Sequence, residues 1–190
     1  MSNVTPAERA RLLGQRPLTV WLTGLSGAGK SSIAGALERR LLDAGRACYL
    51  LDGDAIRAGV SRDLGFAPAD RRENIRRSAE IARLINEAGL IAIAAFISPY
   101  RADREMARQI VGAARFVEVY VDAPLAVCEA RDPKGLYRRA RRGEIAEFTG
   151  VSAPYEPPQA PDVVLATDRR SLADCVDELL SLVMRRLAPA

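Results

Sequence analysis

The sequence predicts an α/β fold in which helices cover both faces of a five-stranded parallel sheet. Short apolar runs, often β-branched, alternate with longer segments of helical spacing, and this alternation is typical of such a sheet. Polar motifs also follow the first three strands, at the edge where parallel sheets bind ligands. The predicted strands span residues 18–23, 47–51, 90–97, 116–121 and 163–166.

Helices are predicted between these strands. The helix after the first strand has Ile33, Leu37 and Leu41 on one face, and Gly45 is a suitable stop. Ser171 is a suitable N-cap for the last helix. The predicted helices span residues 30–44, 71–88, 102–113, 124–131 and 171–187.

The length of 190 residues fits one domain with a full hydrophobic core. We predict an N-terminal arm at residues 1–17, helical over 2–15, and one domain at residues 18–190. Residues 132–161 are weakly apolar and rich in Arg, Gly and Pro. A connection of this length inside a compact domain is usually functional, so we predict a lid there.

Composition and patterning exclude several classes of protein. No apolar run reaches the length of a membrane span, and residues 1–16 lack the apolar stretch of a signal peptide. The chain has no histidine, and its three cysteines lack metal-ligand spacing. The net charge of +4 comes from scattered arginines without interleaved aromatic residues. We therefore expect a cytoplasmic protein without disulfides that acts on neither membranes nor nucleic acids.

A phosphate-binding loop (P-loop) follows the first predicted strand. The residues from Gly24 to Ser31, GLSGAGKS, match G-x-x-x-x-G-K-[ST] with a strand before and a helix after them. Backbone N–H groups would bind phosphates, Lys30 would reach the β- and γ-phosphates of ATP, and Ser31 would bind Mg²⁺. The motif predicts the three-layer fold of P-loop NTPases. The predicted nucleotide site comprises Gly24, Leu25, Ser26, Gly27, Ala28, Gly29, Lys30, Ser31 and Ser32.

The scarcity of lysine strengthens this interpretation. Of the 28 Lys and Arg residues, only Lys30 and Lys134 are lysines. Exposed lysines can be exchanged for arginine, but the planar guanidinium does not replace a compact ammonium group among phosphates. Both lysines are therefore candidates for chemistry, although chance survival is an alternative for Lys134.

Acidic and basic residues after the second strand suit a phosphoryl acceptor. Asp52 follows an apolar strand, as the Mg²⁺-binding acid of P-loop proteins does, and could hold Mg²⁺ through a water molecule. Asp54 is our candidate for accepting the proton of the acceptor hydroxyl, and Arg57 would pair with an anionic acceptor. Arg71 and Asn74 share one face of the next predicted helix. Helix capping and solvent exposure are the alternative roles for these residues.

Two of the four phenylalanines, Phe66 and Phe148, stand in predicted loops. A purine base stacked between them would explain this placement. Packing in the hydrophobic core is an equally good explanation at this stage.

Several strings together resemble the adenylyl-sulfate kinase (APS kinase) family in order and spacing. The resemblance runs from Leu18 to Thr167, and its later strings are more specific than the phosphate-binding loop. The strings are GLSGAGKSS, LDGD-x-x-R, DLGF, DRRENIRR, FISPYRADR, CEARDPKGLYRRARRGEIAEFTG and PYEPP.

The resemblance implies transfer of a phosphoryl group from ATP to the 3′-OH of adenylyl sulfate. It also implies Mg²⁺, a homodimer, a mobile lid and a functional link to ATP sulfurylase. Lys134 would approach the phosphate and sulfate groups, and Arg131 would lie near the ATP adenine. The implied contacts of adenylyl sulfate are Asp54, Arg57, Arg71 and Asn74, with Phe66 and Phe148 around its adenine and Ile97 and Ser98 lining its pocket.

The family motif also places Ser98 among the catalytic residues. We interpret Ser98 as a substrate contact and not as a phosphoserine intermediate, because in-line transfer between two bound nucleotides needs no covalent relay. The sequence departs from the family pattern at Ala55, where Asn is usual, and at Ser152-Ala153, where an acidic residue is usual. Neither departure touches the phosphate-binding residues.

Two other functions are compatible with parts of the sequence. One is a kinase of the same fold that acts on a nucleoside monophosphate or a sugar acid, which would not need the FISPY and RDPKGLY strings. The other is a non-catalytic nucleotide-binding partner of a sulfurylase. The presence of Lys30, Ser31, Asp52 and Asp54 argues against it.

Overall fold

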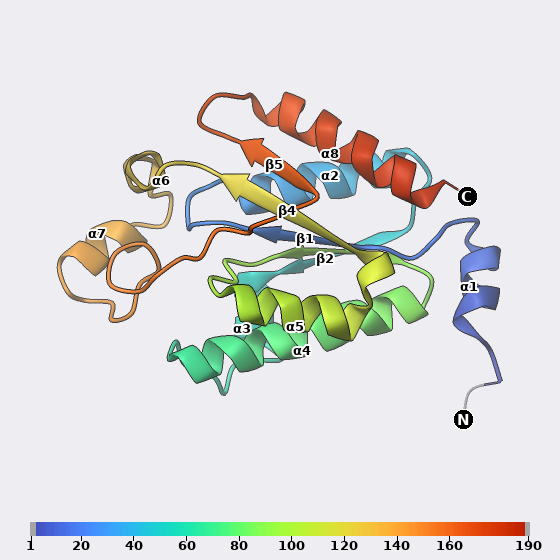
Figure 1. The fold of residues 1–190 in the computed structure, drawn as a ribbon, viewed down its shortest axis with the longest axis horizontal. Helices are drawn as coiled ribbons and strands as arrows, with labels where there is room; N and C mark the ends of the chain where they lie inside the picture. The colour runs from blue at the N-terminus through green and yellow to red at the C-terminus, as the bar shows by residue number, and fades with distance from the viewer. Residues whose placement is uncertain (1–2, 189–190) are drawn as a thin grey trace.

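A computed structural model of the chain describes residues 3–188, and within them a five-stranded parallel sheet forms the centre (Figure 1). Its strand order is β2-β3-β1-β4-β5, so that β1 lies in the middle. Residues 1–2 of the predicted arm and 189–190 of the predicted domain lie outside the described residues. The strands are β1 (Thr19–Thr23), β2 (Cys48–Asp52), β3 (Ile91–Ala95), β4 (Phe116–Asp122) and β5 (Val163–Ala166).

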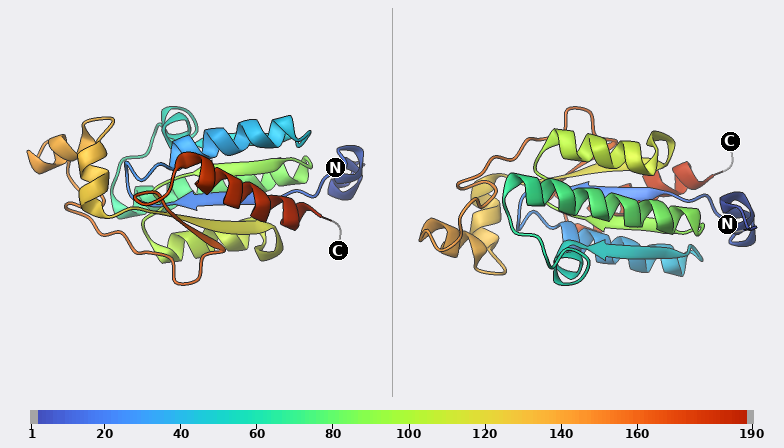
Figure 2. Two further views of the ribbon diagram at one scale, coloured as in Figure 1. Left: turned by 90° about the horizontal axis from the view of Figure 1, so that it is seen from above. Right: turned by 90° about the horizontal axis from the view of Figure 1, so that it is seen from below.

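Helices cover both faces of the sheet, as the sequence predicts. Figure 1 and the two views of Figure 2 place α2 and α8 on one face and α4 and α5 on the other. The helices are α1 (Pro6–Leu12), α2 (Lys30–Asp43), α3 (Gly53–Ala58), α4 (Pro68–Glu87), α5 (Arg101–Val111), α6 (Leu125–Arg131), α7 (Leu136–Arg141) and α8 (Leu172–Leu187), with a 3₁₀ turn at Ala113–Arg115.

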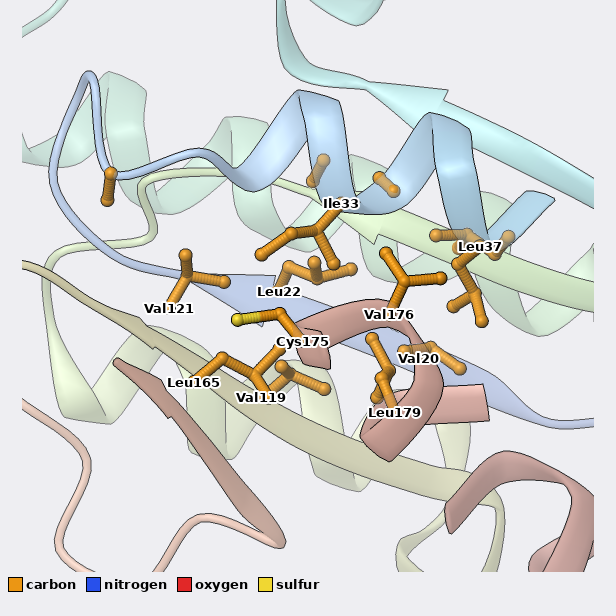
Figure 3. Packing of buried hydrophobic residues seen from close by; sticks show 14 of the residues in the cluster. Val20, Leu22, Ile33, Leu37, Val119, Val121, Leu165, Cys175, Val176 and Leu179 are labelled. Carbon is orange, nitrogen blue, oxygen red and sulfur yellow. The ribbon is translucent and has the colours of Figure 1, made fainter. Parts of the chain in front are cut away.

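The hydrophobic core between the sheet, α2 and α8 fixes the start of α2 behind β1. Figure 3 shows Leu22 of β1 next to Ile33 of α2, with Val176 of α8 close by. These side chains are almost fully buried. Because burial of each such side chain stabilises the fold by roughly 1.5–3 kcal/mol, the connection from β1 to α2 has a fixed frame.

The structure differs from the predicted elements at several places: among them, the arm is helical only over Pro6–Leu12, and α7 lies in the predicted lid. The short helix α3 follows β2 directly, because the Asp52 carboxylate caps it by accepting hydrogen bonds from the N–H groups of residues 54 and 55. Helix α4 begins at Pro68 and not at residue 71, since proline is favoured in the first helical turn. Strand β3 ends at Ala95, so Ile97 and Ser98 lie in the loop beyond it.

The segment of residues 132–161 contains one short helix, α7, and a bridge between Thr149 and Ala153. In Figures 1 and 2, α6 and α7 lie at the end of the sheet opposite to α1. Within residues 3–188, no helix has both the length and the apolar character needed to cross a membrane. The three cysteines, all within the described residues, are free thiols.

The arm is attached to the other end of the sheet. Thr5 caps α1 in a reciprocal arrangement with Glu8. Gln15 then bridges two chain segments: its side-chain nitrogen donates to the carbonyl oxygens of Ala47 and Gly89 at 2.8 and 2.9 Å. Its side-chain oxygen accepts from the Ala47 N–H at 2.9 Å. The arm therefore anchors the sheet far from the loops that follow the strands.

Candidate active site

A cavity of about 1380 Å³ opens where the strands end. The loop after β1, helix α3, the start of α4, the loop after β3 and residues 131–149 all contribute to its walls. Most of the predicted site residues line it: Ser26, Gly27, Gly29, Lys30, Ser31, Ser32, Asp52, Asp54, Arg57, Phe66, Arg71, Asn74, Ile97, Ser98, Arg131, Lys134 and Phe148. Gly24, Leu25 and Ala28 belong to the same loop but do not line the cavity.

The loop from Gly24 to Gly29 passes close to β4 and α6. A Cβ atom on Gly24 would lie 2.3 Å from the carbonyl oxygen of Val121, and Gly24 has a φ of +148°. No other residue fits this position without displacing backbone. The loop leads directly into α2, whose first N–H groups have no side-chain cap. Such a free helix N-terminus suits an anion.

Lys30 is buried at the base of this loop. Its ammonium group donates to the carbonyl oxygens of Gly24 and Leu25 at 2.9 and 2.7 Å. Burial lowers the pKa of Lys30 to about 8, against a weaker opposing effect of Asp52 and Asp54. A phosphate placed at the loop would restore the preference for the charged lysine.

Ser31 and Asp52 lie side by side in the cavity wall. The Ser31 hydroxyl is 3.4 Å from Oδ2 of Asp52, while Oδ1 of Asp52 caps α3. One carboxylate oxygen is thus used by the fold and the other is directed toward Ser31. Hydroxyl and carboxylate oxygens are hard ligands of the type that Mg²⁺ prefers, so this pair fits the predicted metal.

The predicted proton acceptor, Asp54, is in the first turn of α3 and forms an ion pair with Lys134. Both side chains are more than half exposed. The contact joins α3 to the segment of residues 132–161, and both residues line the cavity. The second lysine of the chain is therefore at the site, as its survival in an arginine-rich sequence suggests.

Helix α4 contributes Arg71 and Asn74 on one face. Arg71 donates to the carbonyl oxygens of Phe66 and Glu147 and to the Thr149 hydroxyl, at 2.7 Å and 2.9 Å for the first and last. It thereby holds the 132–161 segment against α4. Asn74 is 4% exposed, and its side-chain oxygen is buried without a hydrogen-bond partner. An unpaired buried acceptor that lines a cavity is suited to receive a hydrogen bond from a ligand.

The two phenylalanines occupy different environments. Phe66 is 59% exposed, and the guanidinium of Arg57 lies 4.4 Å from its ring centroid. Phe148 is buried and packs edge-on against Tyr137, with ring centroids 5.0 Å apart. Burial of the Arg57 guanidinium lowers its pKa, and the nearby charge of Arg71 lowers it further. Phe148 therefore packs in the core and also lines the cavity, while Phe66 presents an exposed ring to it.

Ser98 is buried at the back of the cavity. Its hydroxyl accepts a hydrogen bond from the indole N–H of Trp21 at 3.2 Å, and its φ is +39°. A positive φ is unusual for serine and is often found at functional sites. Ile97 next to it is held through its carbonyl oxygen, which accepts from the Thr23 hydroxyl at 2.7 Å.

Three residues at the site were not predicted from the sequence. The Tyr137 hydroxyl donates to the Ser26 carbonyl oxygen at 2.9 Å and so ties α7 to the phosphate-binding loop. Thr167 donates to the Ala28 carbonyl oxygen at 2.7 Å. Arg131 reaches both Gly27 and Thr167, and its predicted place at the nucleotide end is consistent with this. The third residue that was not predicted is Trp21, whose indole N–H binds the Ser98 hydroxyl. Of the three, only Thr167 carried a local signal in the sequence, because it is polar and directly follows a strand.

Comparison with known proteins decides the family. A family model described as adenylylsulphate kinase matches residues 16–166. The chain belongs to the adenylyl-sulfate kinase family. The adenylyl-sulfate kinase of Aeromonas salmonicida is 57% identical over 178 residues, covering 94% of this chain and 91% of the relative. That of Vibrio cholerae is 55% identical over 185 residues, covering 97% and 84%.

Solved structures agree with this family. The APS kinase of Mycobacterium tuberculosis in complex with AMPPNP and APS has a TM-score of 0.86 and 47% identity, covering 89% of this chain and 98% of that one. A gluconokinase from Sinorhizobium meliloti matches with a TM-score of 0.61 at 18% identity, which shows a shared fold only. Adenylyl-sulfate kinases and sugar kinases therefore share this three-layer architecture.

Proposed function

We propose that this chain transfers the γ-phosphoryl group of ATP directly to the 3′-OH of adenylyl sulfate, giving 3′-phosphoadenylyl sulfate. The observation that carries the proposal is the shared cavity: the phosphate-binding loop and the residues suited to an anionic acceptor line the same walls. Family membership supports the choice of acceptor. The APS kinase of M. tuberculosis was solved with an ATP analogue and APS together.

On the nucleotide side, the loop from Gly24 to Ser32 would bind the triphosphate through its backbone N–H groups. Lys30 would exchange its two loop carbonyl partners for the β- and γ-phosphates. Arg131, which lies against Gly27 and Thr167, would contact the adenine.

Ser31 and Asp52 would hold Mg²⁺, which when bound neutralises charge on the β- and γ-phosphate oxygens. The capping of α3 fixes the Asp52 carboxylate, so that Oδ2 keeps its direction toward Ser31. The protein thereby supplies a preformed pair of oxygen ligands.

On the acceptor side, Asp54 would accept the proton of the 3′-OH once Lys134 has moved from it to the phosphate and sulfate groups. Ser98 would contact the substrate and would not carry the phosphoryl group. The remaining proposed contacts of adenylyl sulfate are Arg57, Phe66, Arg71, Asn74, Ile97 and Phe148.

We further propose that residues 132–161 act as a lid on the domain of residues 18–190 and that residues 1–17 form a separate arm. The contacts of Lys134 and Arg71 support a lid, because they join this segment to α3 and α4 across the cavity. A homodimer and a link to ATP sulfurylase stay predictions from the family resemblance, and a cytoplasmic location stays a prediction from the composition.

The proposal is tested by product analysis with a panel of acceptors. Purified protein is incubated with Mg-ATP and adenylyl sulfate, AMP or gluconate, and the products are identified by mass spectrometry. We expect 3′-phosphoadenylyl sulfate as the product and no phosphorylation of AMP or gluconate. Phosphorylation of AMP or gluconate without any of adenylyl sulfate would reject the proposal.

A further inference from the structure

Arg104 of α5 joins three separate segments behind the cavity. Its side chain is 3% exposed. It donates to the carboxylate of Glu118 on β4 at 2.8 Å, to the Ser98 carbonyl oxygen at 2.7 Å and to the Glu156 carbonyl oxygen at 2.7 Å. Arg104 does not line the cavity, but Ser98 does. One buried guanidinium thus connects the sheet, the loop after β3 and the end of the 132–161 segment.

The loop after β3 needs such support. Ser98 has a positive φ, which an L-residue adopts only when its surroundings determine it. Arg104 binds its carbonyl oxygen and Trp21 binds its hydroxyl, so both sides of the residue are fixed. Residues 97–99 form the cavity wall at this point. The orientation of this wall therefore depends on groups that do not themselves reach the cavity.

The end of the 132–161 segment is attached to the same loop. The Glu156 N–H donates to the Pro99 carbonyl oxygen at 2.8 Å, and the Glu156 carboxylate accepts from the Arg101 N–H at 2.8 Å. The Tyr155 hydroxyl lies 3.0 Å from that of Thr23, which in turn donates to Ile97. Residues 155 and 156 are thus tied to β1 and to the loop after β3.

We propose that Arg104 is a positioning residue for the phosphoryl acceptor. It holds residues 97–99 in the conformation that forms the acceptor wall and fixes the point from which the 132–161 segment closes. The proposal rests on the proposed function, since it takes adenylyl sulfate as the acceptor. We expect replacement of Arg104 to affect binding of the acceptor and not binding of ATP, because its three hydrogen bonds go to Glu118, Ser98 and Glu156 and none to the loop from Gly24 to Ser32.

An arginine is required here by geometry and not only by charge. Three donors in one plane reach three acceptors on different segments, and the compact ammonium of lysine cannot reproduce this fork. Arg108 offers a matched comparison. It also approaches Glu118, at 3.5 Å, and lies over the ring of Phe116, but it touches neither the loop after β3 nor residues 155–157.

The test compares Arg104→Lys with Arg108→Lys by steady-state kinetics and fluorescence. For Arg104→Lys we expect KM for adenylyl sulfate to rise about tenfold or more, since two charged hydrogen bonds to the backbone are lost, while KM for ATP changes less than about twofold. We also expect the emission of Trp21, the chain's one tryptophan, to shift in the protein without substrates. Arg108→Lys should change neither quantity.

The proposal would be overturned if Arg104→Lys left KM for adenylyl sulfate unchanged. It would also be overturned if Arg104→Lys and Arg108→Lys raised KM for adenylyl sulfate and KM for ATP equally. The Trp21 emission needs no substrate, so it tests the loop even if adenylyl sulfate were not the acceptor. An inactive wild type would reject only the proposed function. If Arg104→Lys does not fold, Tyr155→Phe decides: it removes the hydroxyl contact to Thr23, and a selective rise of KM for adenylyl sulfate is again required.

Discussion

Lys30 combines two properties that oppose each other in the protein without substrates. It is buried, which favours the neutral amine, and it faces a loop built for phosphates, which favours the ammonium. In the protein without substrates, the carbonyl oxygens of Gly24 and Leu25 accept hydrogen bonds from its ammonium group. Nucleotide binding is therefore coupled to the protonation of this one side chain.

This coupling gives a pH dependence with a defined sign. Burial lowers the pKa of Lys30 to about 8, and a bound triphosphate would raise that pKa, so ATP binding takes up a proton above pH 8. We expect the affinity for ATP to be constant near neutral pH and to fall by up to about tenfold per pH unit above pH ~8. Isothermal titration calorimetry at several pH values measures the affinity for ATP.

Lys30→Ala is the control for that titration. It should bind ATP more weakly and show no such fall, because the titrating group is gone. A wild-type affinity that stays constant up to pH ~9.5 would contradict the role assigned to Lys30.

Replacing Lys134 shows whether its exposed ion pair with Asp54 contributes to stability or to activity. Its pair with Asp54 is open to water, so Lys134→Ala should shift Tm by less than about 2 °C. If Lys134 moves to the phosphate and sulfate groups in the reaction, kcat/KM for adenylyl sulfate should fall about tenfold or more. Thermal unfolding and kinetics measure the two effects.

Arg142→Ala is a matched control in the same segment. Arg142 pairs with Glu144 on the surface and does not line the cavity, so neither Tm nor kcat/KM should change. A loss of stability without loss of activity in Lys134→Ala would show a purely structural pair.

Single residues were predictable from the sequence where their partners are close in the chain. The phosphate-binding loop spans eight residues between a strand and a helix, and its pattern was sufficient. The contact of Tyr137 with Ser26 joins residues 111 positions apart, and that of Arg104 with Glu156 joins residues 52 apart. No local pattern carries such pairings, so these supporting residues were missed.

At the scale of elements, α3 shows how a cap and a metal ligand share one side chain. Asp52→Asn keeps an oxygen for the N-cap but removes the charge, so Tm should stay within about 2 °C while kcat falls. Asp52→Ala also loses the cap, and should cost about 1 kcal/mol of unfolding free energy in addition. Thermal unfolding and kinetics at varied Mg²⁺ measure both.

An equal loss of stability in the two Asp52 variants would show that the carboxylate charge, and not the cap, supports α3. Full activity of Asp52→Asn at low Mg²⁺ would contradict the assignment of Asp52 as a metal ligand.

Among the elements, the five strands and the long helices were predictable because each has a continuous apolar pattern. Helix α3 and helix α7 have six residues each, too few for such a pattern. Their formation depends on acceptors outside the helix, the carboxylates of Asp52 and Asp132, which bind the first N–H groups. Short helices of this kind follow from tertiary context and not from periodicity.

At the scale of the whole molecule, the cavity and the hydrogen bonds of Gln15 lie at opposite ends of the sheet. Gln15 makes three hydrogen bonds to the backbone of Ala47 and Gly89 at the end remote from the cavity. Gln15→Ala should therefore lower the unfolding free energy by about 2 kcal/mol or more, with KM values unchanged. Chemical denaturation and kinetics measure this separation.

The control is Gln109→Ala. Gln109 makes one hydrogen bond to Glu105 on the surface, so its replacement should change stability by less than about 0.5 kcal/mol. A raised KM in Gln15→Ala would mean that the two ends of the sheet are coupled.

The central claim is that one cavity brings ATP and adenylyl sulfate together for a single direct transfer. The stereochemical course at the transferred phosphorus tests it, using ATP made chiral at the γ-position with sulfur and oxygen isotopes. One in-line displacement inverts the configuration, and inversion is the result that we predict. Retention would require two displacements, as through a phosphorylated Ser98, and would contradict the account.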